Sequence, residues 1–156
     1  MKECQNPIHA FFLKRPVQII KFTSSNLDVI NIYRSANGHS LVLLDHIIRI
    51  LPEKKAVIIT GDFNICYQMN RTNRLIEGLE THGFRQLVQE ATHIRGRHID
   101  RAYWRDSEGM MLAPALDRYS PYYSDHDAIC LTLEKKQMSE QNIMQTKKLA
   151  DPANPG

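Results

Sequence analysis

The sequence predicts a layered α/β domain, and three observations carry this prediction. Short runs rich in β-branched residues, bounded by polar residues or glycine, are typical of buried strands. Two other stretches space their apolar residues by three and four, which is typical of amphipathic helices. These elements follow one another as strand, strand, helix, strand, helix and strand, and this order is typical of a layered α/β domain.

Composition and charge narrow the class of protein. The chain has 156 residues, enough for one domain, with 42% hydrophobic and 24% charged residues. No apolar run approaches the roughly 20 residues that span a bilayer, so we expect no membrane partner. The net charge of +3 is compatible with a polyanionic partner. Three scattered cysteines form no disulfide framework, which favours a reducing, intracellular compartment.

The first half of the chain contains the clearest elements. Residues 1–16 carry little signal, and the strands expected at 17–22 and 27–33 form a hairpin around a polar turn. A helix is expected at 40–51, where Ser40 or Asn37 caps the start and Pro52 stops it. Its apolar face comprises Leu41, Leu44, Ile47, Ile48 and Leu51.

A buried strand is expected at 56–60, and Gly61 then permits a sharp turn. The second helix is expected at 72–82, with Thr72 as its cap and Gly83 after its end. Its buried face comprises Leu75, Ile76 and Leu79.

The second half is more polar, and its strands are shorter. They are expected at 84–88, 98–104, 110–112 and 127–133, with the second and third paired. Residues 134–156 are polar, contain two prolines and are expected to form a disordered tail. The expected domain therefore spans residues 17–133.

Four polar clusters stand at the ends or turns of these strands. They are Tyr33-Arg34, Asp62-Phe63-Asn64, His98-Ile99-Asp100 and Ser124-Asp125-His126. Cleavage of a phosphodiester needs a group that orients or deprotonates water, and donors that stabilise the charged transition state. Aspartate, asparagine, histidine and tyrosine suit these tasks.

Each cluster also has a plainer interpretation. Asp62 can satisfy the backbone donors of an ordinary turn, and Asp125-His126 can cap the following strand. Asp100 can pair with a neighbouring arginine on the surface, and Tyr33 can pack in the core. The seven histidines contain no pair at the i, i+4 spacing of a zinc site.

Taken in order, four stretches resemble the endonuclease/exonuclease/phosphatase superfamily. Gly61-Asp62-Phe63-Asn64 and Ser124-Asp125-His126 match its two most specific motifs. Asn31-Ile32-Tyr33-Arg34-Ser35 and Thr92-His93…Gly96…Ile99-Asp100 look most like the retrotransposon-type, apurinic/apyrimidinic-like endonucleases. The resemblance implies part of a four-layer α/β/β/α sandwich. Members begin with strands that carry an asparagine and a metal-binding glutamate, and these strands are expected to be missing here.

The resemblance implies a role for each matching residue. Asp62 would orient and activate the attacking water, while Asn64 and Tyr33 would contact the scissile phosphate. His126 would donate to a non-bridging phosphate oxygen, and Asp100 would hold His126 in place.

The same resemblance implies a divalent cation. Asp125 would help to hold Mg²⁺ or Mn²⁺, and the family's principal ligand, a glutamate, has no convincing counterpart because Glu3 follows no strand. A longer polyprotein or a separate N-terminal half would supply it.

Four arginines are expected to contact nucleic acid, and DNA is the expected partner. They are Arg34, Arg95, Arg97 and Arg101. The alternative is a solvated basic segment. Tyr103 and Trp104 could stack on a base, but core packing is the favoured use.

The leading functional hypothesis is Mg²⁺-dependent hydrolysis of DNA phosphodiesters by an endonuclease, impaired if the N-terminal strands are absent. One alternative is an inactive fragment that at most binds nucleic acid, and another is a phosphatase of a phosphoinositide-like ester. A DNA substrate would indicate the nucleus.

Overall fold

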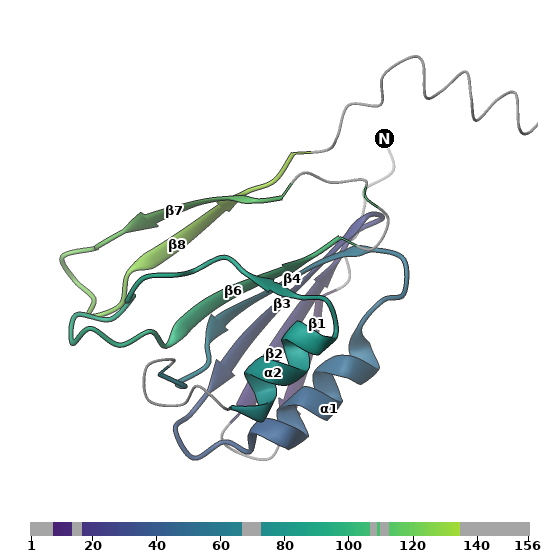
Figure 1. Cartoon of the computed structure of the whole chain (residues 1–156), viewed down its shortest axis with the longest axis horizontal. Coiled ribbons are helices and arrows are strands. Elements are labelled where there is room, and N and C mark those ends of the chain that lie inside the picture. The colour runs from purple at the N-terminus through teal and green to yellow at the C-terminus, as the bar shows by residue number, and fades with distance from the viewer. Residues whose placement is uncertain (1–7, 14–16, 67–72, 107–108, 110–112, 135–156) are drawn as a thin grey trace, which may run out of the picture.

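The structure is a computed structural model, and it describes residues 8–13, 17–66, 73–106, 109 and 113–134. Two β-sheets and two helices make up this part of the chain (Figure 1). None of its helices is long and apolar enough to cross a membrane.

The larger sheet has six strands in the order β1-β2-β3-β4-β6-β5. Their bounds are β1 Ile8–Leu13, β2 Val17–Thr23, β3 Leu27–Arg34, β4 Ala56–Asp62, β5 Arg85–Gln86 and β6 Asp100–Arg105. Strands β3 and β4 are parallel, and every other neighbouring pair is antiparallel. The carboxyl ends of β3 and β4 and the start of β6 therefore meet at one end of the sheet.

Both helices cover one face of the large sheet. They are α1, Ser40–Ile50, and α2, Arg74–Thr81 (Figure 1). Because side chains alternate between the faces of a strand, one set from each strand packs under the helices. The main core comprises such residues, among them Ile19, Ile30, Ile32, Val57, Ile59 and Tyr103, with Leu43, Ile47, Leu75 and Leu79 from the helices.

The small sheet covers part of the opposite face. It is the antiparallel pair β7, Ala115–Tyr119, and β8, Ala128–Thr132. Leu131 and Leu133 pack against a second core cluster of Ala56, Ile58 and Trp104. The described chain therefore has three layers: helices, the large sheet and the small sheet.

The same face is open over β2 and β3. Ile20 is 38% exposed and Phe22 is 41% exposed, although both are apolar strand residues. Among the described residues, the small sheet extends over β4 and β6 and leaves this area uncovered. The described residues form no fourth layer over this area, and the four-layer sandwich stays a prediction.

Most of the predicted elements are confirmed within one or two residues at each end. The hairpin β2–β3, the strand β4 and both helices lie where the sequence places them. The expected strand 110–112 and the tail 135–156 lie outside the described residues.

Several details of the prediction were wrong. His39 is the N-cap of α1, and neither Ser40 nor Asn37 takes that place; Leu41 is 51% exposed. The N-cap of α2 is Asn73, whose side chain accepts a hydrogen bond from Leu75 N, and Thr72 lies outside the described residues. Two strands, β1 and β7, were not predicted.

Candidate active site

Three of the predicted site residues form one row across the large sheet. Tyr33 on β3 pairs with Asp62 on β4, and Asp62 pairs with Asp100 on β6. All three share a strand face with Ile58 and Trp104 of the second core cluster, because residues two apart along a strand share a face. The row therefore lies on the face that carries the small sheet, at the end where β3 and β4 finish.

Gly61 brings β3 and β4 unusually close at this end. Its φ is +131°, and a Cβ on Gly61 would lie 1.9 Å from the carbonyl oxygen of Ile32. Gly61 nevertheless lies within β4, paired with Ile32 and Arg101, so the prediction of a turn that starts there was wrong. The turn begins after Asp62: Asn64 has a φ of 49°, and its N–H donates to Asp62 Oδ1 at 2.8 Å.

The buried side chain of Arg34 stabilises this turn through hydrogen bonds to backbone carbonyls. Its Nη1 donates to the carbonyl of Phe63 at 2.9 Å, and its Nε donates to the carbonyl of Gly38 at 2.9 Å. The residue is 7% exposed, and burial lowers the pKa of its guanidinium, while the charge of Asp62 raises it. Arg34 thus fixes the backbone that carries Asp62 and Asn64.

His126 reaches the row from the loop between β7 and β8. Its Nδ1 lies 2.8 Å from Asp100 Oδ2, and the hydroxyl of Thr92 donates to the same oxygen at 2.7 Å. The backbone N–H of Asp100 donates back to Thr92 Oγ1 at 3.2 Å. Asp100 therefore fixes the orientation of both the Thr92 hydroxyl and the His126 ring.

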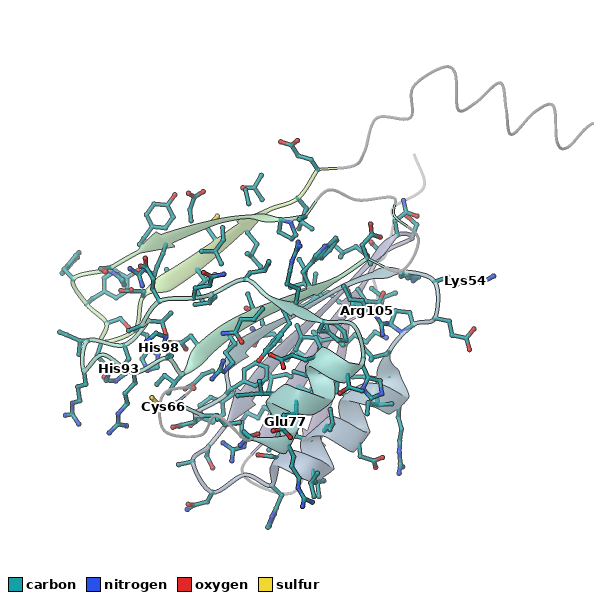
Figure 2. All side chains as sticks on the ribbon, viewed as in Figure 1. Lys54, Cys66, Glu77, His93, His98 and Arg105 are labelled. Carbon is teal, nitrogen blue, oxygen red and sulfur yellow. The ribbon has the colours of Figure 1, made fainter. Side chains whose placement is uncertain are left out.

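Two loops are joined where His126 enters the site. His93 and His126 form an isolated antiparallel bridge, and their rings meet edge to face at 4.9 Å. Asp127 N donates to the carbonyl of Thr92 at 2.7 Å. Figure 2 shows His93 and His98 at this end of the molecule, far from Lys54.

Two titratable groups of the site, Asp62 and His126, have shifted pKa values. Burial raises the pKa of Asp62, the N–H of Asn64 lowers it, and the nearby charge of Asp100 raises it, with a net increase. Burial lowers the pKa of His126, but its hydrogen bond to Asp100 and the negative charge of Asp100 raise it more, so it stands above its usual value. The site thus combines a more basic carboxylate with a histidine that holds its proton more firmly.

Among the described residues, two groups of side chains could hold a metal ion. One is Asp62, Asp100 and His126, the other is His93, Asp125 and His126, and in each group the ligand atoms lie within 4.8 Å of one another. Mg²⁺ prefers oxygen ligands and keeps several waters, so one or two carboxylates suffice. Asp125 offers a carboxylate that is 65% exposed, and its Oδ2 lies 3.2 Å from His93 Nε2. These carboxylates fit a hydrated divalent ion.

The four arginines that were predicted to contact nucleic acid differ in exposure: two are buried and two are exposed. Arg101 is fully buried, and its guanidinium donates to Gln86 Oε1 and to the carbonyl of Ile65, each at 2.8 Å. Like Arg34, it donates to backbone carbonyls of the protein's own interior, and both side chains are buried in the described structure. Arg95 and Arg97 are exposed on the loop that carries His93.

Comparison with solved structures identifies the fold. CdtB, the biologically active subunit of cytolethal distending toxin, matches with a TM-score of 0.56 and 16% identity over 78% of this chain. The *Haemophilus ducreyi* cytolethal distending toxin matches with a TM-score of 0.53 and 14% identity over 83% of this chain. The chain has the endonuclease/exonuclease/phosphatase fold. At these identities the likeness shows the fold alone.

Each match covers only part of this chain and only part of the matched chain. The chain spans 55% of the matched CdtB chain and 57% of the matched *Haemophilus ducreyi* chain. An endonuclease/exonuclease/phosphatase family protein from *Leptotrichia buccalis* matches with a TM-score of 0.48 and 11% identity, over 76% of this chain and 53% of its own. No protein-family model matches the sequence, and no curated protein does.

Two residues of the candidate site, Thr92 and His93, were not predicted from the sequence. Thr92 is buried and holds Asp100, and His93 lies against both Asp125 and His126. Both belong to the Thr92-His93 pair of the motif that indicated the retrotransposon-type branch. That motif was the available signal, but it gives no indication of which side chains these residues touch.

Proposed function

We propose that this chain carries the hydrolytic site of a DNA endonuclease of retrotransposon type that uses Mg²⁺ or Mn²⁺. One observation carries the proposal: Asp62 and Asp100 stand directly opposite each other on β4 and β6, with His126 held by Asp100 at 2.8 Å. Like charges directly opposite on neighbouring strands destabilise a sheet. A pair of this kind in a perturbed electrostatic setting favours a functional role.

The side chains divide the chemistry of phosphodiester hydrolysis. Asp62 accepts a hydrogen bond from the attacking water and orients it, since burial makes this carboxylate more basic. Protonated His126 donates from Nε2 to a non-bridging phosphate oxygen as negative charge grows on it. Tyr33, 47% exposed beside Asp62, and Asn64 contact the phosphate.

A divalent ion would be held chiefly by Asp125. When bound, it would supply a positive charge beside the phosphate and stabilise the departing oxygen. Asp62 and Asp100 already accept hydrogen bonds from protein donors, and the carboxylate of Asp125 is more exposed than either of them.

DNA as the substrate is supported by the exposed cations near the site. Arg95 and Arg97 lie on the loop that is bridged to His126, where they can neutralise backbone phosphates on either side of the cut. A DNA-directed enzyme would act in the nucleus.

The test is nicking of supercoiled plasmid in Mg²⁺ and, separately, in Mn²⁺. Asp62→Asn and His126→Ala should each lower the nicking rate by about 100-fold or more, because general acid–base groups typically contribute 10²–10⁴-fold. The matched controls are Asp45→Asn and His39→Ala, since Asp45 is exposed on α1 and the His39 side chain makes no cap hydrogen bond. These controls should nick like the wild-type chain.

Equal rates for the wild-type chain and both site variants would overturn the proposal. Any nicking that remains would then come from a contaminating nuclease. Loss of activity in the control variants would show instead that the assay reports folding rather than chemistry.

Binding of nucleic acid without cleavage is the second candidate function. It is favoured by the ligand groups themselves, because neither group found among the described residues contains a glutamate. Salt-dependent DNA binding by the wild-type chain, without Mg²⁺-dependent nicking, would select this function over the first.

A further inference from the structure

Two exposed tyrosines stand next to the candidate active site. Tyr122 is 99% exposed and Tyr123 is 79% exposed, and their rings meet edge to face with centroids 5.3 Å apart. We call these two residues the tyrosine pair. Aromatic side chains ordinarily bury most of their large surface, so two neighbouring rings left in solvent indicate a surface for a ligand.

The local backbone places the tyrosine pair close to His126. Ser124 N donates to the carbonyl of Pro121 at 3.4 Å, so the two tyrosines occupy the central positions of a β-turn. Ser124 Oγ then accepts from His126 N at 3.0 Å, which ties the turn to the catalytic histidine. Tyr123 precedes His126 by three residues, a span of at most about 10 Å. This equals about three base steps of a nucleic acid strand.

A second turn at the same rim exposes complementary side chains. Gly96 N donates to the carbonyl of His93 at 2.8 Å, and this turn presents Ile94, which is 81% exposed, together with Arg95. Ile94 N donates to the carbonyl of Asp125 at 2.9 Å, so the two turns are joined. Proteins that open base stacks use apolar side chains as wedges and arginine on phosphates.

We propose that the tyrosine pair binds an unpaired nucleobase within about three nucleotides of the scissile phosphate, by stacking. This inference rests on the proposed function and names its substrate class: DNA with a mismatch, a gap or a single-stranded flank beside the cut. In a fully paired duplex the faces of each base are covered by its neighbours. A ring can stack on such a base only after the base is unstacked, and this costs least where pairing is already lost.

The test measures binding without cleavage. Oligonucleotides carry 2-aminopurine, a fluorescent base, unpaired at successive positions within three nucleotides of the cut site, and titrations are made in EDTA. Wild-type protein should quench the fluorescence at one or two of these positions. Tyr122→Leu/Tyr123→Leu should lose the quenching and about 5- to 100-fold in affinity for this DNA.

Two controls separate stacking from other effects. Tyr122→Phe/Tyr123→Phe keeps both rings and should bind like wild type. Tyr119→Leu removes a tyrosine that is 59% exposed on β7, outside the turn, and should leave the quenching unchanged. Affinity for the fully paired duplex should change little in all variants.

The inference fails if the leucine variant binds the mismatched and paired DNA as wild type does. It also fails if the leucine variant loses both equally, which would indicate a general contact. The proposed function is tested separately by plasmid nicking. Quenching without Mg²⁺-dependent nicking would support base binding by the tyrosine pair and overturn the proposed catalysis. Nicking that ignores unpaired bases and the leucine substitutions supports catalysis and overturns the role of the tyrosine pair.

Discussion

Replacement of Arg34 by methionine tests whether this residue serves the fold or the ligand. The guanidinium is buried and donates to the carbonyls of Phe63 and Gly38. Methionine fills a similar volume but donates no hydrogen bond. Arg34→Met should therefore lower the free energy of unfolding and leave the proposed DNA binding by exposed side chains intact.

The size of the loss follows from the two carbonyls. A hydrogen bond to a charged group contributes about 1.5–3 kcal/mol, so losing the partners of two carbonyls costs about 3–6 kcal/mol in total. Part of this is returned, because a buried guanidinium has its own desolvation cost that methionine lacks. We expect a net loss of about 2–4 kcal/mol in the free energy of unfolding.

Urea unfolding followed by tryptophan fluorescence measures this loss, since Trp104 is 5% exposed in the second core cluster. Arg95→Met is the matched control. It should change the free energy of unfolding by less than about 0.5 kcal/mol. It should also reduce the salt slope of DNA binding by about one, as expected for one lost phosphate contact.

The result that would refute the reasoning is the reverse pattern. If Arg34→Met kept wild-type stability and reduced the salt slope, the guanidinium would have to face DNA, as the sequence first indicated.

Two further predictions concern the site and its glycine. Asp100→Asn should lower the pKa of His126 in metal-free protein, measured by NMR titration, because it removes the carboxylate charge that raises it; Asp125→Asn should lower it less. An unchanged His126 titration in Asp100→Asn would contradict the pairing of the two side chains. Because the pKa of His126 is higher in the folded protein, the stability that its protonation contributes is complete below the unfolded pKa near 6.5. This contribution is lost as pH rises through the folded pKa. Gly61→Ala should cost more than about 3 kcal/mol of unfolding free energy, because the added Cβ meets the backbone of β3. Gly96→Ala, with a φ of +69° and no neighbour within 4 Å, should cost only about 1–2 kcal/mol, and equal losses would contradict the close approach at Gly61.

The sequence predicted those elements whose residues are buried on a regular period. Leu75, Ile76 and Leu79 are buried on α2 as their spacing indicates, and the β-branched run of β4 is buried on both faces. Strand β7 could not be found this way. It belongs to a two-stranded sheet, where most of its side chains, including Asp117 and Arg118, are exposed. Its sequence therefore lacks the alternation of apolar and polar residues that indicates a strand.

The motifs located the site residues but could not reveal their partners. Arg34 follows Tyr33 in sequence, but strand alternation places the two on opposite faces, and only Tyr33 faces the row. His93 and His126 are far apart in the chain and lack the i, i+4 spacing of a local pair, yet a backbone bridge brings their rings together. Contacts of this kind come from tertiary structure, which single-sequence patterns do not contain.

The candidate site lies at the junction of the two sheets, and each sheet positions a different part of it. Tyr33, Asp62 and Asp100 are fixed by strand pairing within the large sheet, so their spacing is rigid. His126 lies on the loop between the two strands of the small sheet. Hydrogen bonds between this loop and the loop of Thr92 and His93, chiefly that from Asp127 N to the Thr92 carbonyl, hold His126 against Asp100. Because Arg118 also pairs with Asp127 at 3.3 Å, the small sheet holds this junction from its own side. The position of His126, the proposed proton donor, relative to Asp62 therefore depends on the packing of one sheet on the other. A polypeptide that covered the open face of β2 and β3 would adjoin the row at Tyr33, on the side away from His126.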